Sequence, residues 1–172
     1  MPSPEIEMSS TEDRNRAVVQ ASFDAWAAGT GSPFELLARE ATWTIVGRSV
    51  ASATYNREGF MSEVIRPFNA RMRAGLKPSI RSLIAEGNAV VVVFDGNGIA
   101  LDGKPYANTY AWFLQMRDGE IVKASAFFDS IEFNDLWQRV QPAPAELRAQ
   151  GIARVARGAI PVRVGSPRPI AV

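Results

Sequence analysis

Two Asp-Gly pairs, at residues 102–103 and 118–119, divide the stretch 89–129 into runs rich in aromatic and β-branched side chains. An Asp-Gly pair accepts the positive φ of a tight hairpin turn at little cost. The run before the first pair, residues 89–94, reads A-V-V-V-V-F and has the composition of a strand. The pattern therefore predicts three consecutive antiparallel strands in this part of the chain.

The segments outside this stretch predict helices first and strands afterwards. A first helix is expected from an N-cap within residues 9–13 to about Ala28. Further helices are expected at residues 33–40, 57–74 and 131–140, and further strands at residues 41–46 and 80–85. Helices followed by antiparallel strands indicate the α+β class. We expect a cone-shaped, curved antiparallel sheet with helices packed on its concave face around a central pocket.

The length of 172 residues suits one compact domain. Residues 1–10 are expected to be disordered, and residues 11–140 to form the domain. Residues 141–172 form a basic tail with five arginines and one glutamate, although the whole chain has a net charge of only +1. The arginines are spaced out and no aromatic residues alternate with them, so nucleic acid is not the expected partner.

Histidine and cysteine are both absent from the sequence. Their absence excludes imidazole acid–base catalysis, Ser-His triads and thiolate chemistry, and it removes the commonest metal ligands. Acid–base chemistry would fall to Asp, Glu, Tyr, Lys or water, and we expect neither a metal nor an organic cofactor. The first residues lack the pattern of a signal peptide and no apolar run reaches the length of a membrane span. A cytoplasmic location without membrane contact is therefore expected.

Four residues of the middle predicted strand point to a ligand cavity. Counting in twos, Tyr106, Asn108, Tyr110 and Trp112 share one face of that strand. A buried amide needs hydrogen-bond partners, which a ligand or a neighbouring tyrosine would supply. A phenol hydroxyl can donate to a substrate carbonyl oxygen, and Tyr110 is the more central of the two tyrosines. The alternative is ordinary packing of the sheet.

Asp95 follows four valines and a phenylalanine and is the candidate acid–base residue. In a cavity, an apolar wall would raise its pKa and suit it to proton transfer. Alternation places it with Asn97 on a continuing strand, whereas the alternative reading makes Asp95-Gly96 a turn or bulge. Asp129 is a second acid that could reach a cavity, but the Asp-x-x-Glu pattern at residues 129–132 favours a helix cap.

Four segments, in this order and spacing, carry a resemblance to a known family. They are A-T-W-T-I-V-G at 41–47, Y-N-R-E-G-F at 55–60, G-K-P-Y-A-N-T-Y at 103–110 and R-D-G-E-I-V…F-F-D at 117–129. With the predicted elements, they resemble the nuclear transport factor 2-like superfamily, and within it the SnoaL-like, ketosteroid-isomerase-related proteins. The resemblance covers about residues 11–140. It implies a cone-shaped barrel, usually a homodimer, with a mostly apolar pocket.

The positions that match catalytic groups in this superfamily are mostly apolar here. The catalytic groups of ketosteroid isomerases, whose chemistry depends on tuned pKa values, fall on Ile45 or Val46, Phe23 and Trp112. The two aspartates and the arginine of limonene-epoxide-hydrolase-like enzymes fall on Asp95, Ala126 and Val93, with Tyr55 and Asn56 near the water-holding pair. Steroid isomerisation is therefore not expected, and one carboxylate of the hydrolase pair is retained.

These residues lead to one preferred function and two alternatives. The preferred function is a SnoaL-like enzyme that transfers protons in a small apolar carbonyl or cyclic substrate, by isomerisation, dehydration or aldol-type cyclisation. Asp95 would act as acid–base, while Tyr110, Asn108 and Tyr55 would hold a substrate oxygen. Substrate contacts are expected from Trp43, Trp112, Phe128, Asn97, Asp129 and Tyr106. The alternatives are a non-catalytic ligand-binding or dimerisation module, and an epoxide hydrolase.

Overall fold

The computed structural model describes residues 9–144. The chain divides into a compact unit at Met1–Pro142 and a second unit at Ala143–Val172, and the helices and strands described below all lie in the first. The disordered segment predicted at residues 1–10 and the basic tail predicted at 141–172 fall almost entirely outside the described residues. Within those residues, the helices are too short or too polar to span a membrane.

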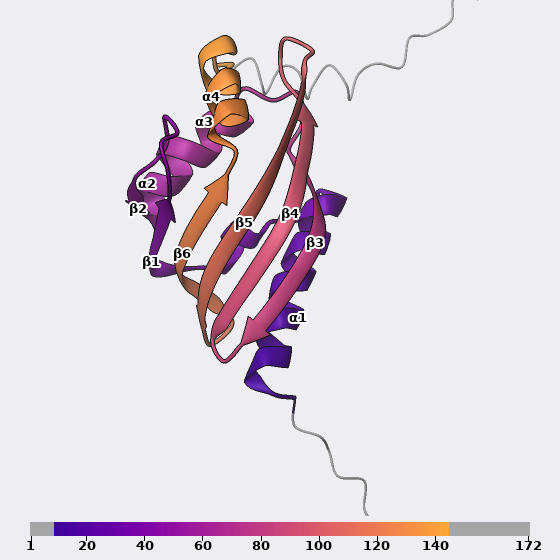
Figure 1. Cartoon of the computed structure of the whole chain (residues 1–172), viewed down its shortest axis with the longest axis vertical. Helices are drawn as coiled ribbons and strands as arrows, with labels where there is room; N and C mark the ends of the chain where they lie inside the picture. The colour runs from indigo at the N-terminus through magenta and orange to yellow at the C-terminus, as the bar shows by residue number, and fades with distance from the viewer. Residues whose placement is uncertain (1–8, 145–172) are drawn as a thin grey trace, which may run out of the picture. The chain divides into compact units, whose positions relative to one another are not determined.

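Six strands form one curved sheet in the order β2-β1-β6-β5-β4-β3 (Figure 1). Strands β3 to β6 make the antiparallel meander that the sequence predicts, whereas β1 and β6 run parallel. Gly103 and Gly119 adopt φ values of 88° and 78°, as expected of the two Asp-Gly turns. The strands are β1 (Leu37–Ile45), β2 (Thr54–Asn56), β3 (Lys77–Glu86), β4 (Ala89–Ile99), β5 (Pro105–Arg117) and β6 (Glu120–Phe128).

Helix α1, Thr11–Ala28, confirms the first predicted helix. The side chain of Ser10 accepts a hydrogen bond of 3.1 Å from the backbone N–H of Asp13, and Gly29 ends the helix with a φ of 74°. The cap satisfies a backbone donor that has no partner in the first turn, and glycine adopts the left-handed conformation without strain. Phe23 of α1 packs edge-on against Phe94 of β4, with ring centroids 4.9 Å apart.

The helix predicted at residues 33–40 is wrong. Only Pro33–Leu36 form a short 3₁₀ helix, η1, and the chain then enters β1. β1 pairs with β6 and buries alternate side chains such as Trp43 on the inner face of the sheet. Burial of that alternating set outweighs the helical preference of the segment E-L-L-A-R-E.

The helix predicted at residues 57–74 is shorter and consists of three parts. These are α2 (Arg57–Gly59), a π-helix η2 (Phe60–Ile65) and α3 (Arg66–Asn69). The side chain of Asn56 caps the first part by accepting a backbone hydrogen bond of 2.7 Å. π-Helical turns are rare and frequently occur at functional sites.

The core lies between the inner face of the sheet and the helices; in Figure 1, α1 lies behind the sheet and α4 lies above the end of β6. Two glycines of β4 allow the segment that follows α3 to approach this face closely. A Cβ atom on Gly96 would lie 2.5 Å from Leu76 and 3.0 Å from the Tyr110 ring, and one on Gly98 would lie 2.5 Å from the methyl group of Met72. The segment after α3 therefore packs directly on the backbone of β4, beside Tyr110.

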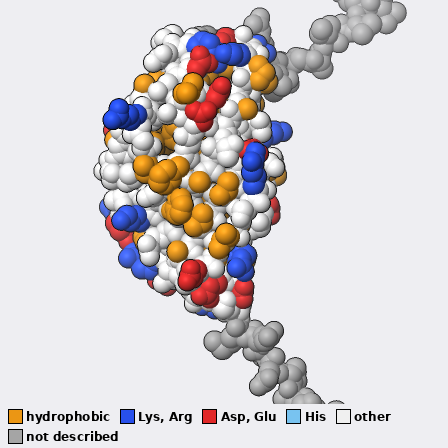
Figure 2. Space-filling view, in the orientation of Figure 1, with side chains coloured by type: hydrophobic (Ala, Val, Ile, Leu, Met, Phe, Trp, Pro, Cys, Tyr) orange, Lys and Arg blue, Asp and Glu red, His pale blue; other side chains and the backbone are white. Residues whose placement is uncertain are grey.

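The opposite face of the sheet carries an apolar outer patch, defined by Ile84, Val91, Val93, Ala111, Phe113 and Phe127. Figure 2 shows hydrophobic side chains gathered in the middle of this face. Phe113 and Phe127 are 49% and 44% exposed, and their ring centroids lie 5.6 Å apart across β5 and β6.

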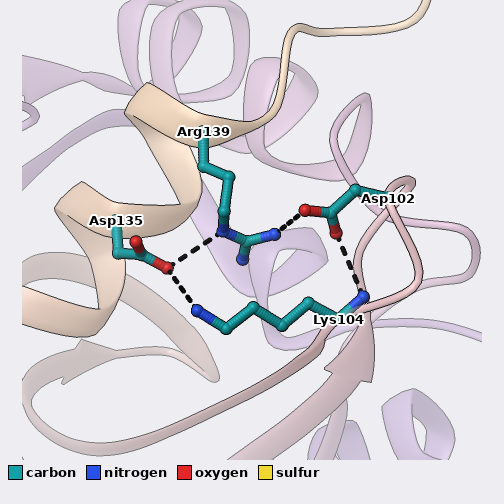
Figure 3. A network of polar contacts seen from close by, with 4 residues as sticks. All are labelled: Asp102, Lys104, Asp135 and Arg139. Atoms are coloured by element: carbon teal, nitrogen blue, oxygen red, sulfur yellow. Dashed lines mark hydrogen bonds and ion pairs between the residues drawn. The ribbon is translucent and has the colours of Figure 1, made fainter.

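Helix α4, Ser130–Arg139, is held to the β4–β5 turn by a network of charged groups (Figure 3). Arg139 pairs with Asp102 of the turn, and its Nε lies 3.0 Å from Asp135. Lys104 reaches the same carboxylate of Asp135 at 3.4 Å and donates its backbone N–H to Asp102 at 3.1 Å. Because several charges share partners, the network holds the end of α4 more firmly than an isolated surface pair would.

Candidate functional site

A cavity of about 200 Å³ lies between the inner face of the sheet, α1, η1, the η2–α3 helix and α4. Aromatic and aliphatic side chains make up most of its wall, with Ser32, Asn69 and Tyr110 as the main polar residues. None of the described residues that line it is charged. The lining residues are Trp26, Ser32, Phe34, Trp43, Ile45, Phe60, Met61, Val64, Ile65, Phe68, Asn69, Leu76, Tyr110, Trp112, Ala126, Phe128 and Phe133.

Trp112 is the centre of the aromatic wall. Its ring lies 4.8 Å from that of Phe94 and 4.9 Å from that of Trp43, both edge-on. Trp43 in turn stacks on Phe60 of the π-helix, with ring centroids 4.4 Å apart. Edge-on and offset aromatic pairs of this kind add stability beyond the area they bury. The wall is therefore formed by rings that pack directly on one another.

A chain of hydrogen bonds runs from α4 to the cavity wall. The backbone N–H of Asp129 donates to Asn108 Oδ1 at 3.0 Å, and Asn108 Nδ2 donates to the Asp129 carbonyl oxygen at 2.9 Å. Asn108 Nδ2 also donates to the Tyr106 hydroxyl at 3.0 Å, which lies 2.7 Å from the hydroxyl of Tyr110. Of the three side chains, only Tyr110 lines the cavity.

Burial controls the protonation of this tyrosine pair. Desolvation raises the pKa of Tyr106 from 10.0 to about 12, against the opposing effect of its hydrogen bonds. Burial, followed by the neighbouring Tyr106, raises the pKa of Tyr110 well above 10.0. Both phenols are therefore neutral at physiological pH and act as hydrogen-bonding groups, not as bases.

Asp95 does not line the cavity, so the prediction that its carboxylate faces the cavity is wrong. Its carboxylate lies on the outer face of the sheet, where Arg81 Nε and Thr109 Oγ1 each donate to it at 2.7 Å. The hydrogen bond from Arg81, followed by that from Thr109, lowers the pKa of Asp95 from 3.8. An ion-paired carboxylate of low pKa on the opposite face has no geometric support as the acid–base group of this cavity.

Three other expected site residues also lie away from the cavity wall. Asp129 is exposed and caps α4, with its side chain accepting a hydrogen bond from the Ile131 N–H at 2.9 Å. Tyr55 donates its hydroxyl to the Ala51 carbonyl oxygen at 2.7 Å, and burial raises its pKa. Asn97 is exposed and lines a separate, polar hollow with Arg81, Asp95 and Thr109.

The structure places Trp43, Trp112, Phe128 and Tyr110 on the cavity wall, whereas Tyr106 and Asn108 lie behind it. The sequence predictions do not include the helical part of the lining. That part comes from the apolar stripe of the 57–74 segment, whose amphipathic pattern is the signal that could have pointed to it. Its members on the wall are Phe60, Met61, Val64, Ile65 and Phe68. In addition, the described residues hold no group of three or more carboxylates arranged to bind a metal ion.

Comparison with known protein families matches residues 19–124 to the SnoaL-like domain. No curated protein sequence matches the chain. Among solved structures, Bal32a from a soil-derived mobile gene cassette is 16% identical, with a TM-score of 0.62, over 74% of this chain and 99% of its own.

Two further solved structures have the same fold. A protein from Jannaschia sp. CCS1 that is named as a SnoaL-like polyketide cyclase is 16% identical, with a TM-score of 0.60, over 77% of this chain and 96% of its own. TerC, co-crystallised with polyporic acid, is 20% identical, with a TM-score of 0.57, over 73% and 98%. At these identities the likeness establishes the fold alone.

Proposed function

Because the chain belongs to the SnoaL-like domain family, we propose that its aromatic cavity binds a small, uncharged, ring-containing molecule with one oxygen placed against Tyr110. The observation that carries this proposal is an aromatic cavity with a tyrosine, Tyr110, in its wall and, among the described residues, no charged lining side chain. Apolar walls with a few well-placed polar groups are typical of small-molecule sites.

The volume of the cavity limits the size of the ligand. An apolar cavity of about 150 Å³ holds benzene. A cavity of about 200 Å³ therefore suits one ring or two fused rings. The co-crystallisation of TerC with polyporic acid supports a small molecule as the occupant of this fold.

The absence of charged lining residues among those described limits the charge of the ligand. Moving a carboxylate from water into such an environment costs several kcal/mol unless a cation pairs with it. A neutral ketone, quinone or ether oxygen meets no such cost. We therefore expect 1-indanone to bind and benzoate not to bind.

A cavity-filling variant tests the proposal. Ala126 lines the cavity and is 2% exposed, so Ala126→Phe should lower the affinity for 1-indanone at least about tenfold by occupying its space. Ala107→Phe adds the same side chain to an exposed position of β5 and should leave the affinity unchanged. Isothermal titration calorimetry measures both, after circular dichroism has shown that each variant is folded. Equal binding to both variants would place the ligand elsewhere and refute the proposal.

A second candidate function is cofactor-independent proton transfer on a carbonyl or cyclic substrate, by isomerisation, dehydration or aldol-type cyclisation. The pairing of Tyr110 with Tyr106 at 2.7 Å favours it, because a donor at a substrate oxygen stabilises the negative charge that develops on enolisation. No carboxylate of the described residues lines the cavity, so the proton would pass to the substrate itself or to water. Any such activity should be lost in Ala126→Phe and retained in Ala107→Phe.

We propose that a second copy of the chain covers the outer patch, which makes the protein a homodimer. Charges of both signs surround the patch, including Glu86 and Lys123 at one end and Arg81 with Asp95 at the other. A surface that meets its own copy across a two-fold axis needs such self-complementarity.

The mass of the protein in solution tests this proposal. Phe113→Asp puts a charge in the middle of the patch, and analytical ultracentrifugation should detect a dimer for the wild type and a monomer for the variant. Because Phe113 lies on the face opposite the cavity, the affinity for 1-indanone should be the same in both. A wild-type monomer at high concentration would contradict the proposal.

A further inference from the structure

We propose that Asn108 is a positioning residue that fixes the direction of the Tyr106–Tyr110 hydrogen bond, so that the cavity selects ligands that accept a hydrogen bond. The inference rests on the proposed function and deepens it, because it names the chemical class of the ligand. It follows from the order in which four polar groups donate and accept.

The first step is the orientation of the Asn108 amide. A backbone N–H can only donate and a carbonyl oxygen can only accept. Both backbone groups of Asp129 bond the same amide, at 3.0 Å and 2.9 Å, so Oδ1 must face the N–H and Nδ2 must face the carbonyl. The second proton of Nδ2 then points at the hydroxyl oxygen of Tyr106, 3.0 Å away.

The second step is the hydroxyl proton of Tyr106. Tyr106 is 1% exposed, and among the described residues its hydroxyl has hydrogen bonds to Asn108 and Tyr110 only. Asn108 already donates to it, so the Tyr106 proton has one acceptor left, the oxygen of Tyr110 at 2.7 Å. If Tyr110 donated to Tyr106 instead, the buried hydroxyl proton of Tyr106 would have no acceptor, and an unpaired buried donor costs free energy.

The third step is the hydroxyl proton of Tyr110. Its oxygen accepts from Tyr106, and among the described residues its proton has no other partner. Because Tyr110 lines the cavity and its proton has no acceptor among the described residues, the cavity is where an oxygen or nitrogen atom of a ligand would accept this proton. The cavity therefore offers a donor, and ligands that can only donate have no partner at this point.

The substitution Asn108→Asp should invert the pattern. An ionised carboxylate oxygen in place of Nδ2 can only accept, so Tyr106 would donate to it and Tyr110 would donate to Tyr106. A protonated carboxyl group at this position would donate to the Asp129 carbonyl oxygen and still accept from Tyr106. In either state the Tyr110 oxygen, not its proton, would face the ligand, and donors would be preferred.

Three bicyclic probes of similar size measure the preference by isothermal titration calorimetry. 1-Indanone accepts a hydrogen bond, indole donates one, and indene does neither. The wild type should bind 1-indanone about fivefold to tenfold more tightly than indene, and indole no more tightly than indene. Asn108→Asp should give the reverse order, with indole favoured by a similar factor.

Two further variants keep the test decisive. Asn97→Asp makes the same chemical change at an exposed position of β4 and should keep the wild-type order. Tyr106→Phe removes the donor to Tyr110 and should allow both 1-indanone and indole to bind better than indene; it replaces Asn108→Asp if that protein does not fold. If no probe binds the wild type, the proposed function fails. If the probes bind but neither Asn108→Asp nor Tyr106→Phe changes the wild-type order, only the role of Asn108 is overturned.

Discussion

Replacing Trp112 by alanine is expected to lower the free energy of unfolding by about 3–5 kcal/mol, the range for truncation of a buried aromatic side chain. Trp112 is 4% exposed, and its ring packs within 6.0 Å, centroid to centroid, of five other rings, those of Phe23, Trp26, Phe34, Trp43 and Phe94. The space left by the indole would join the existing cavity, so we expect the surrounding rings to relax into it only in part. Urea unfolding followed by circular dichroism measures the loss.

Two further variants make this result specific. Trp112→Phe keeps an aromatic ring and should lose clearly less stability than the alanine variant. Gln115→Ala changes an exposed residue of the same strand and should stay within about 0.5 kcal/mol of the wild type. A loss below about 1 kcal/mol for Trp112→Ala would show that this ring is not part of a packed wall.

The second large effect is expected at alkaline pH. The pKa of Tyr106 is about 12 in the folded protein, against 10.0 for an exposed tyrosine, because burial disfavours the phenolate. The unfolded chain therefore releases this proton first, and stability falls as the pH rises from 10 to 12. A shift of about two pKa units corresponds to about 3 kcal/mol, all of it present below pH 10. Tyr110 should add to the loss, since its pKa is raised as well.

The absorbance of tyrosinate provides the measurement. The chain has three tyrosines, and the two buried ones, Tyr106 and Tyr110, should contribute little tyrosinate near pH 10.5 in the folded protein. Absorbance should rise together with the loss of circular dichroism at higher pH. The double variant Tyr106→Phe/Tyr110→Phe should lose less stability between pH 9 and pH 11.5 than the wild type. Early, gradual ionisation in the native protein would contradict the burial of the pair.

The meander of strands was predictable because its signals are local. The Asp-Gly pairs fix two turns, and the runs between them alternate or are β-branched, so neighbouring strands follow directly. The segment at residues 33–40 was not predictable in the same way. Its sequence favours a helix locally, and only its pairing with a strand some 80 residues later makes part of it a strand.

The position of Asp95 shows why the candidate site was predicted only in part. Alternation correctly places Asp95 and Asn97 on one face of β4, and Tyr106, Asn108 and Tyr110 on one face of β5. The register of β4 against β5 decides which side chains of the two strands share a face of the sheet. Asp95 lies opposite Thr109, not opposite Tyr110. A shift of one residue would have brought the carboxylate to the cavity. Because residues 90–94 are apolar on both faces of the strand, alternation alone does not show which face is buried.

Helix α4 is anchored at both ends to the hairpin formed by β4 and β5. At its start, the Asn108 amide makes two hydrogen bonds with the backbone of Asp129, and at its end, Arg139 pairs with Asp102. Phe133, between these two anchor points, forms part of the recess. A ligand of the proposed site would therefore meet walls that are already ordered, so binding would cost little conformational entropy and would favour discrimination by shape. Ring systems slightly wider than the cavity should therefore not bind, because the walls do not widen to admit them.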